Sequence, residues 1–123
     1  WTPTSFIGQL LKTIGQYVAP PKHVQSPSKW GTVDFIDQHF KPYCTRIEVE
    51  TKVFNFRYHS PEHWLDLFRT YYGPVHKAFA TLDASTAKKL SEDIFALIEK
   101  FNRADDGTVV IASDYLEVVA IKK

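Results

Sequence analysis

Hydrophobic side chains recur every three or four residues near the start of the chain and predict a helix there. This apolar stripe consists of Phe6, Ile7, Leu10, Leu11, Ile14 and Val18. Thr2 can cap the N-terminus of the helix, and Pro3 suits its first turn. A proline-rich loop at 19–29 follows, because prolines fix φ and lack a backbone donor. A second, shorter apolar pattern predicts a helix that ends at about Phe40, so residues 1–40 form N-terminal helices around the loop.

The pattern changes to the alternation of a β-strand in residues 45–58. The apolar positions first occupy one face and then shift to the other, where the large side chains are Phe54, Phe56 and Tyr58. A β-bulge near Val53–Phe54, or burial of both faces at that end, would account for the shift. Residues 108–121 are rich in valine and isoleucine and predict a second long strand.

The segment between the two strands has helical periodicity. A helix begins at Ser60–Glu62, where a hydroxyl cap is followed by a proline and an acidic residue. Gly73–Pro74 ends or kinks this helix, and the helical pattern then resumes over 75–82. Asp83 or Ser85 can cap a further helix that continues to about residue 103.

Two long strands that bracket a helical segment predict an α+β fold in which the strands pair antiparallel. Residues 45–123 then form a strand–helices–strand unit, and 1–123 form a single domain or a fragment of a larger protein. An isolated pair of strands is marginal in water, so the strand edges are expected to need a partner. That partner would be a missing N-terminal half or a second copy of the chain, as in a dimer. The sequence contains no Met, even at position 1, which favours a fragment.

The composition is that of a globular protein, with 44% hydrophobic and 24% charged residues. Lys and Arg number 15 against 14 Asp and Glu, a balance that does not attract nucleic acid or an anionic membrane surface. No apolar run is long enough to predict a membrane span. The single cysteine, Cys44, cannot form an internal disulfide, so a reducing compartment such as the cytoplasm is expected.

The chain lacks the glycine-rich motifs that bind phosphates and nucleotides. Its five glycines are scattered singly, and no nucleophile elbow is present. His59 and His63 stand four residues apart, but the helix start at Ser60–Pro61 separates them. Two histidines that flank a helix cap are a simpler interpretation than a metal site. We therefore expect neither a cofactor nor a metal ion to bind this chain alone, and we assign no catalytic residue.

An aromatic cluster is the main candidate for a binding site; it comprises Trp64, Phe68, Tyr71, Tyr72 and His76. An aromatic stripe of this kind more often faces a hydrophobic core than a ligand. As the wall of a pocket, its tyrosine hydroxyls and imidazole would orient the polar group of a small molecule. Because adjacent tyrosines cannot share one helix face, either Tyr71 or Tyr72 points away from the stripe.

Several segments resemble the C-terminal portion of class I S-adenosylmethionine-dependent methyltransferases. These segments are Trp1-Thr2-Pro3, Phe6-Ile7-Gly8-Gln9, Trp30-Gly31-Thr32, the run from Phe54 to Trp64, the run from Phe68 to Pro74, the run from Phe101 to Thr108, and Tyr115-Leu116-Glu117-Val118-Val119. The resemblance implies that 45–58 and 108–121 are the sixth strand and the antiparallel seventh strand of a larger α/β sheet. The helices between them would cover the substrate side. The family's cofactor-binding glycine loop and acidic residue have no counterpart here.

The resemblance implies S-adenosylmethionine-dependent methyl transfer to a small-molecule acceptor by the full-length protein. This part would shape the acceptor pocket, with Tyr71, Tyr72 and His76 in contact with the acceptor, and would be inactive alone. The alternative is a free-standing ligand-binding or dimerisation module with an aromatic pocket. An apolar cavity in a compact monomer favours the module, whereas intermolecular strands or large exposed apolar surface favour the methyltransferase part. A small hydrolase that uses His63 or His76 lacks an identifiable nucleophile.

Overall fold

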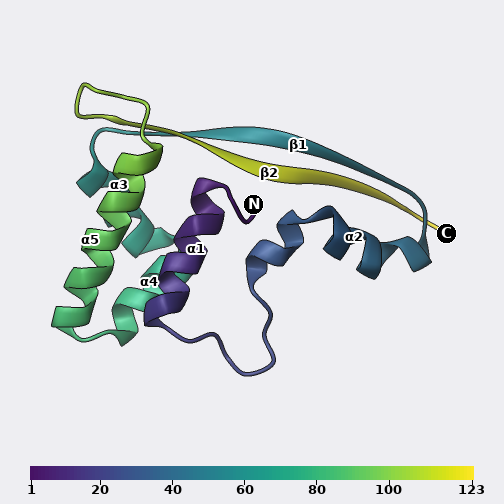
Figure 1. Ribbon diagram of the computed structural model, residues 1–123, viewed down its shortest axis with the longest axis horizontal. Coiled ribbons are helices and arrows are strands. Elements are labelled where there is room, and N and C mark those ends of the chain that lie inside the picture. The colour runs from purple at the N-terminus through teal and green to yellow at the C-terminus, as the bar shows by residue number, and fades with distance from the viewer.

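The computed structural model describes residues 1–123 as one long two-stranded sheet with helices packed beneath it (Figure 1). The strands are β1 (Cys44–Tyr58) and β2 (Val109–Lys122). The helices are α1 (Phe6–Tyr17), α2 (Val33–Phe40), α3 (Pro61–Tyr71), α4 (Gly73–Thr81) and α5 (Ala84–Phe101). Short 3₁₀ turns at Pro27–Gly31 and Lys41–Tyr43 flank α2. The predicted α+β fold with two bracketing antiparallel strands is confirmed.

The two strands pair without interruption from Tyr58↔Val109 to Arg46↔Ile121, and the register shifts only between Cys44 and Arg46. The β-bulge considered near Val53–Phe54 is therefore wrong. Instead, the two halves of the ribbon bury opposite faces. Near the end of β1, Phe56 and its partner Ile111 are buried on one face of the ribbon. In the first half of β1, Ile47 and Val49 are half-buried instead, and their odd numbers place them on the opposite face. Helix α2 lies against that other half, away from the remaining helices (Figure 1).

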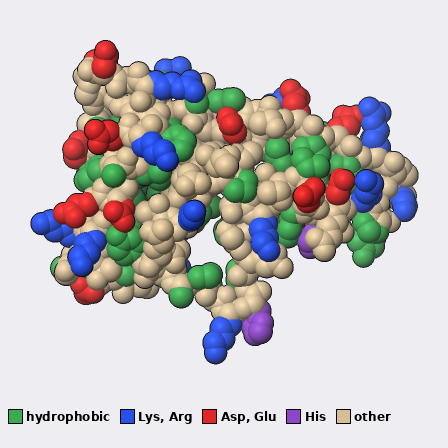
Figure 2. Space-filling view, viewed as in Figure 1, with side chains coloured by type: hydrophobic (Ala, Val, Ile, Leu, Met, Phe, Trp, Pro, Cys, Tyr) green, Lys and Arg blue, Asp and Glu red, His purple; other side chains and the backbone are tan.

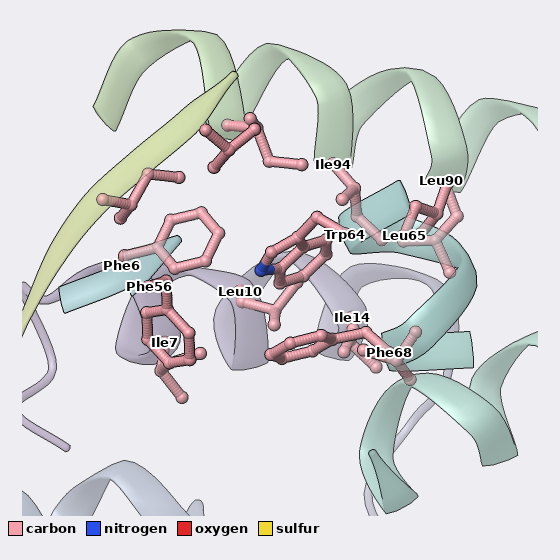
Figure 3. Close-up of a cluster of buried hydrophobic side chains, with 14 of the residues drawn as sticks. Phe6, Ile7, Leu10, Ile14, Phe56, Trp64, Leu65, Phe68, Leu90 and Ile94 are labelled. Atoms are coloured by element: carbon pink, nitrogen blue, oxygen red, sulfur yellow. The ribbon is translucent and has the colours of Figure 1, made fainter. Parts of the chain in front are cut away.

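The hydrophobic core lies between helices α1, α3, α4 and α5 and the end of the ribbon where Tyr58 pairs with Val109. Trp64 is fully buried at its centre, where it stacks on Phe68 at 3.9 Å between ring centroids and meets Phe6 edge-on at 5.4 Å (Figure 3). The other members of the core are Ile7, Leu10, Ile14, Phe56, Leu65, Val75, Ala78, Leu90, Ile94, Ile98, Val109 and Ile111.

Helix α1 begins three residues later than the sequence predicts, because Ser5 and not Thr2 caps it. The Ser5 hydroxyl accepts a hydrogen bond from the Gly8 N–H at 3.2 Å and donates to the Thr2 carbonyl at 2.7 Å. The Thr2 N–H instead donates to the carbonyl of Asp114 in β2, at 3.0 Å. The buried hydroxyl of Ser113 accepts from the Ile7 N–H at 3.3 Å. The N-terminal end of α1 is thus held against β2.

The other helix starts agree with the sequence. Ser60 caps α3 by accepting the His63 N–H at 3.1 Å, and Asp83 caps α5 by accepting the Thr86 N–H at 2.9 Å. The expected break between α3 and α4 falls at Tyr72, and α4 begins at Gly73, two residues before the predicted start, with Pro74 in its first turn. No helix combines the length and the apolar composition that crossing a bilayer requires. Charged side chains of both signs are spread over the face seen in Figure 2.

Two glycines allow the N-terminal residues to lie directly against the rest of the chain. A Cβ atom on Gly8 would overlap the carbonyl oxygens of Thr2 and Pro3, and one on Gly31 would overlap the carbonyl of Trp1. The segment from Trp1 to Pro3 therefore passes through a space that only glycine leaves open. Gly15, in the same helix as Gly8, has no atom near its missing Cβ.

The two glycines of α1 give a matched pair of substitutions. Gly8→Ala should lower the free energy of unfolding by about 1–3 kcal/mol, because the new methyl group meets backbone that cannot move aside. Gly15→Ala should raise it by up to about 1 kcal/mol, since alanine favours a helix and the site is open. Urea unfolding of both variants measures the difference. Equal effects of the two substitutions would contradict the placement of Trp1–Pro3 against α1.

Candidate functional site

An aromatic groove lies along the last residues of β1, between the N-terminal segment and α3. It consists of two adjoining hollows of about 280 and 310 Å³, both of which use Phe68 and Tyr72 as walls. The remaining lining residues of the aromatic groove are Trp1, Ile7, Phe54, Phe56, Tyr58, Leu67 and Tyr71. No charged side chain lines it, so its only polar side-chain atoms are the indole nitrogen of Trp1 and the tyrosine hydroxyls.

Edge-to-face and tilted ring contacts hold the groove together. Phe56 lies 5.7 Å from Trp1 and 6.0 Å from Phe68 between ring centroids, and Phe68 lies 5.0 Å from Tyr72. Phe54 contacts Trp1 at 6.3 Å but remains 50% exposed. The groove thus has a packed floor and an open rim, which is the shape that an apolar ligand requires.

Tyr58 and Tyr72 in the groove remain neutral at ordinary pH. Burial raises the pKa of Tyr58 above its usual value of 10.0, and burial likewise raises the pKa of Tyr72. A neutral phenol can donate a hydrogen bond, so these hydroxyls are suited to an oxygen or nitrogen atom of a ligand.

The structure brings together three of the five residues that the sequence proposes for the site. Phe68, Tyr71 and Tyr72 line the groove, although Tyr71 is 79% exposed at its rim. Trp64 and His76 do not line it. The His76 ring instead lies beside Arg69, with its Nδ1 at 2.8 Å from the Arg69 carbonyl oxygen, and so links α4 to the end of α3.

Trp64 belongs to the core and not to the groove. Its side chain is fully buried, and its Nε1–H has no hydrogen-bond partner. The ring of Phe6 lies beside the indole with its plane at 77° to it (Figure 3).

Sequence reasoning missed half of the groove, namely the wall built by Trp1 and β1. Phe54, Phe56 and Tyr58 carry a signal, since three aromatic side chains on one face of a strand end form a continuous surface. Trp1 carries no local signal, because its position depends on the close approaches at Gly8 and Gly31.

A basic end adjoins the aromatic groove where β1 passes into α3. This hollow of about 320 Å³ is lined by Arg57, Tyr58, His59, His63, Thr108, Val109 and Val110. The His59 N–H donates to Nδ1 of His63 at 3.3 Å, and the two rings stack at 5.1 Å. His59 lies outside α3, as the sequence predicts. The two imidazoles have no Cys, Asp or Glu beside them to complete a set of three metal ligands.

The largest cavity, about 490 Å³, lies elsewhere, between α1, the proline-rich loop and α4. In Figure 2 the molecule is visibly hollowed in this region. Lys12 and Lys77 are its charged residues, and it contains no aromatic ring, imidazole or carboxylate. It therefore offers fewer groups than the aromatic groove for orienting a ligand.

The five main hollows lack two groups that often bind a nucleoside cofactor. None of them is lined by a carboxylate that would accept hydrogen bonds from ribose hydroxyls, and none contains a glycine-rich turn.

The half-buried phenols of Tyr58 and Tyr72 should make stability depend on pH in the alkaline range. The pKa of each phenol is higher in the folded than in the unfolded protein. Their contribution to the free energy of unfolding is therefore complete below pH 10 and is lost as the pH rises through the folded pKa. Replacing both by Phe (Tyr58→Phe with Tyr72→Phe) should flatten the fall in unfolding free energy between pH 9 and pH 11, measured by urea unfolding. The exposed Tyr71 supplies the control, Tyr71→Phe. A slope that the double variant leaves unchanged would mean that the two phenols are hydrated in the folded protein.

No protein-family model matches the chain. Over an alignment of 105 residues it is 30% identical to an uncharacterized protein of Mycobacterium bovis and to uncharacterized proteins of two Mycobacterium tuberculosis strains, CDC 1551 and H37Rv. In each case the match covers 75% of this chain and 38% of the relative. The chain therefore spans well under half the length of the curated relatives that it matches.

Proposed function

We propose that residues 1–123 form the C-terminal, substrate-side part of an S-adenosylmethionine-dependent methyltransferase that acts on a small molecule. In this proposal the chain supplies the acceptor pocket and is inactive without further strands that carry the cofactor site. The observation that carries the proposal is an aromatic groove at the carboxyl end of a long strand, on a ribbon whose outer edges have no partner.

The position of the groove supports this function. Phe54, Phe56 and Tyr58 are the last inward-facing residues of β1, and α3 begins three residues after the strand ends. In open α/β sheets, ligands bind beside the carboxyl ends of the strands, where the chain turns into the covering helices. If β1 belongs to such a sheet, the aromatic groove lies where a substrate would be held.

The free edge of β2 supports a larger sheet. The carbonyls of Val110 and Asp114 point away from β1, since they accept hydrogen bonds from Arg103 and Thr2. Backbone groups alternate in direction along an antiparallel ladder, so those of Leu116, Val118 and Ala120 also point outward. These three residues have no backbone partner on that side. An unpaired edge of this length is a place where another strand adds.

The groove residues suit the demands of methyl transfer to a small acceptor. Such a reaction depends mainly on holding the reacting atoms in line and on excluding water, and both needs are met by a rigid apolar wall. The neutral hydroxyls of Tyr58 and Tyr72 can donate hydrogen bonds to the acceptor and so fix its orientation. No side chain in the groove is placed as a general base, and the proposal assigns none.

A free-standing ligand-binding or dimerisation module is the second candidate. One observation favours it: the chain closes a core of 15 buried residues by itself and also contains the groove. Such a module would use the groove without any cofactor, and its free strand edges would pair with a second copy.

Calorimetric titration of S-adenosylmethionine distinguishes the two candidates. The chain alone should give no binding heat, because it offers no glycine-rich turn and no carboxylate in a hollow. A chimera in which this chain replaces the matched segment of the Mycobacterium tuberculosis relative should bind the cofactor and transfer a labelled methyl group to small apolar acceptors. Stoichiometric binding to the chain alone, or a chimera that folds without binding the cofactor, would refute the proposal.

Hydrogen exchange tests the free edge directly. In the chain alone, the amides of Leu116, Val118 and Ala120 should exchange fast, because their N–H groups point to solvent. In the chimera the same amides should be protected by at least about a hundredfold, as expected for a central strand. Protection that appears in the chain alone and grows with its concentration would instead indicate self-pairing and favour the dimerisation module.

A further inference from the structure

We propose that the aromatic groove and the basic end together bind one amphipathic organic anion, with a flat apolar body in the groove and an anionic group, such as a carboxylate, at Arg57 and His63. Under the proposed function, this anion is the methyl acceptor. Only its role as acceptor rests on that proposed function. Binding itself requires neither cofactor nor catalysis.

The two regions meet at one side chain. Tyr58 lines both the 310 Å³ hollow of the groove and the 320 Å³ hollow of the basic end. Its ring lies edge-on to Phe68 at 6.3 Å on one side and to His63 at 5.7 Å on the other. A ligand that lies across Tyr58 would therefore contact an aromatic surface at one end and nitrogen donors at the other.

The groove selects an apolar, ring-containing body. Its lining has no charged group, and the rings of Phe54, Phe56, Phe68 and Tyr72 are set at steep angles to one another. Rings arranged in this way receive a further aromatic ring edge-on or offset, which stabilises beyond the burial of area. A charged head group buried here would have no partner and would lose its hydration.

The basic end supplies the donors that such a head group needs. Arg57 takes part in no ion pair of the protein. Nδ1 of His63 accepts the His59 N–H, so the neutral ring carries its proton on Nε2, which makes no hydrogen bond within the chain. Guanidinium and imidazole N–H groups are the common partners of carboxylates.

Two acidic residues adjoin the basic end in the sequence, Glu62 beside His63 and Asp106 near Thr108, and neither lines the hollow. Asp106 accepts hydrogen bonds from the hydroxyl of Thr108 at 2.6 Å and from its N–H at 3.0 Å. These bonds hold the pKa of Asp106 below its usual value, and its carboxylate does not line the hollow. Arg57 and His63 thus line this hollow with no carboxylate among the other lining residues.

Two naphthalene probes that differ in one group test the proposal. 1-Anilinonaphthalene-8-sulfonate carries an anionic head, and N-phenyl-1-naphthylamine has the same ring system without it. Fluorescence titration of the chain should show that the anionic probe binds about tenfold more tightly. N–H shifts in two-dimensional NMR should be confined to residues 7, 54–63, 67–72 and 108–110, together with the indole N–H of Trp1.

Substitutions then assign each part of the probe to its site. R57Q, and separately H63Q, should remove the tenfold preference for the sulfonate and leave the neutral probe unchanged. F54S, at the open rim, should weaken both probes together. K77Q, which removes the same charge at the large cavity, is the matched control and should change neither. Circular dichroism confirms that each variant folds.

Three results would overturn the proposal: equal affinity for the two probes, loss of the preference in K77Q but not in R57Q, or shifts outside the stated residues. These outcomes are separate from those of the cofactor titration. Failure of the chimera to bind S-adenosylmethionine would remove the role as acceptor and leave the anion site, whereas failure of the probes would leave the methyltransferase assignment to stand without a named substrate.

Discussion

The antiparallel pairing of β1 with β2 determines where every other element can bury its apolar face. Residues directly opposite each other share a face, so Phe56 and Ile111 present one apolar surface, and a slip of one residue would turn both away from the helices. In the outer half of the ribbon the same face is charged, and Glu50 lies directly opposite Glu117. Lys52 offsets that repulsion by bonding Glu117 at 2.9 Å and Glu50 at 3.5 Å. The hydrogen bond to Glu117 and both negative charges raise the pKa of this lysine. The ribbon therefore changes its buried face along its length while its hydrogen-bond register stays intact.

The groove depends on that ribbon and on a second constraint, the path of the first three residues. Trp1 reaches Phe56 only because its own carbonyl lies against Gly31 and the next two carbonyls lie against Gly8. Thr2 is held by its bond to Asp114, and the hydroxyl of Ser5 closes the turn into α1. Main-chain hydrogen bonds and glycine contacts thus position an aromatic side chain that has little secondary structure of its own. A site wall built in this way is sensitive to changes that never touch the ligand.

The sequence predicts the elements well and the site only in part, and one physical reason explains both outcomes. Helices and strands follow from periodic patterns of neighbouring residues, so β1, β2 and a break in the helix directly before Gly73–Pro74 are confirmed. The helix start at Thr2 is wrong because a tertiary bond to β2 takes that residue out of the helix. The same stripe that predicts a pocket wall also contains Trp64, and only the three-dimensional packing decides that it faces the core while Tyr72 faces the groove. No pattern within a single element indicates that Trp1 completes that groove.

The free edge exposes polar backbone groups and the groove exposes aromatic rings, and the two lie on different parts of the ribbon. The outward carbonyls of Val110 and Asp114 are already bonded, so the continuous free stretch of β2 begins at Leu116, in the half of the ribbon farther from Tyr58. A strand added there would cover the outer half of β2 without reaching the mouth of the groove between Tyr58 and α3. The edge can thus be satisfied permanently by backbone pairing, while the groove stays accessible to a molecule that must enter and leave. That division agrees with the proposed substrate-side role in a larger sheet, in which assembly and binding would use different surfaces of the same two strands.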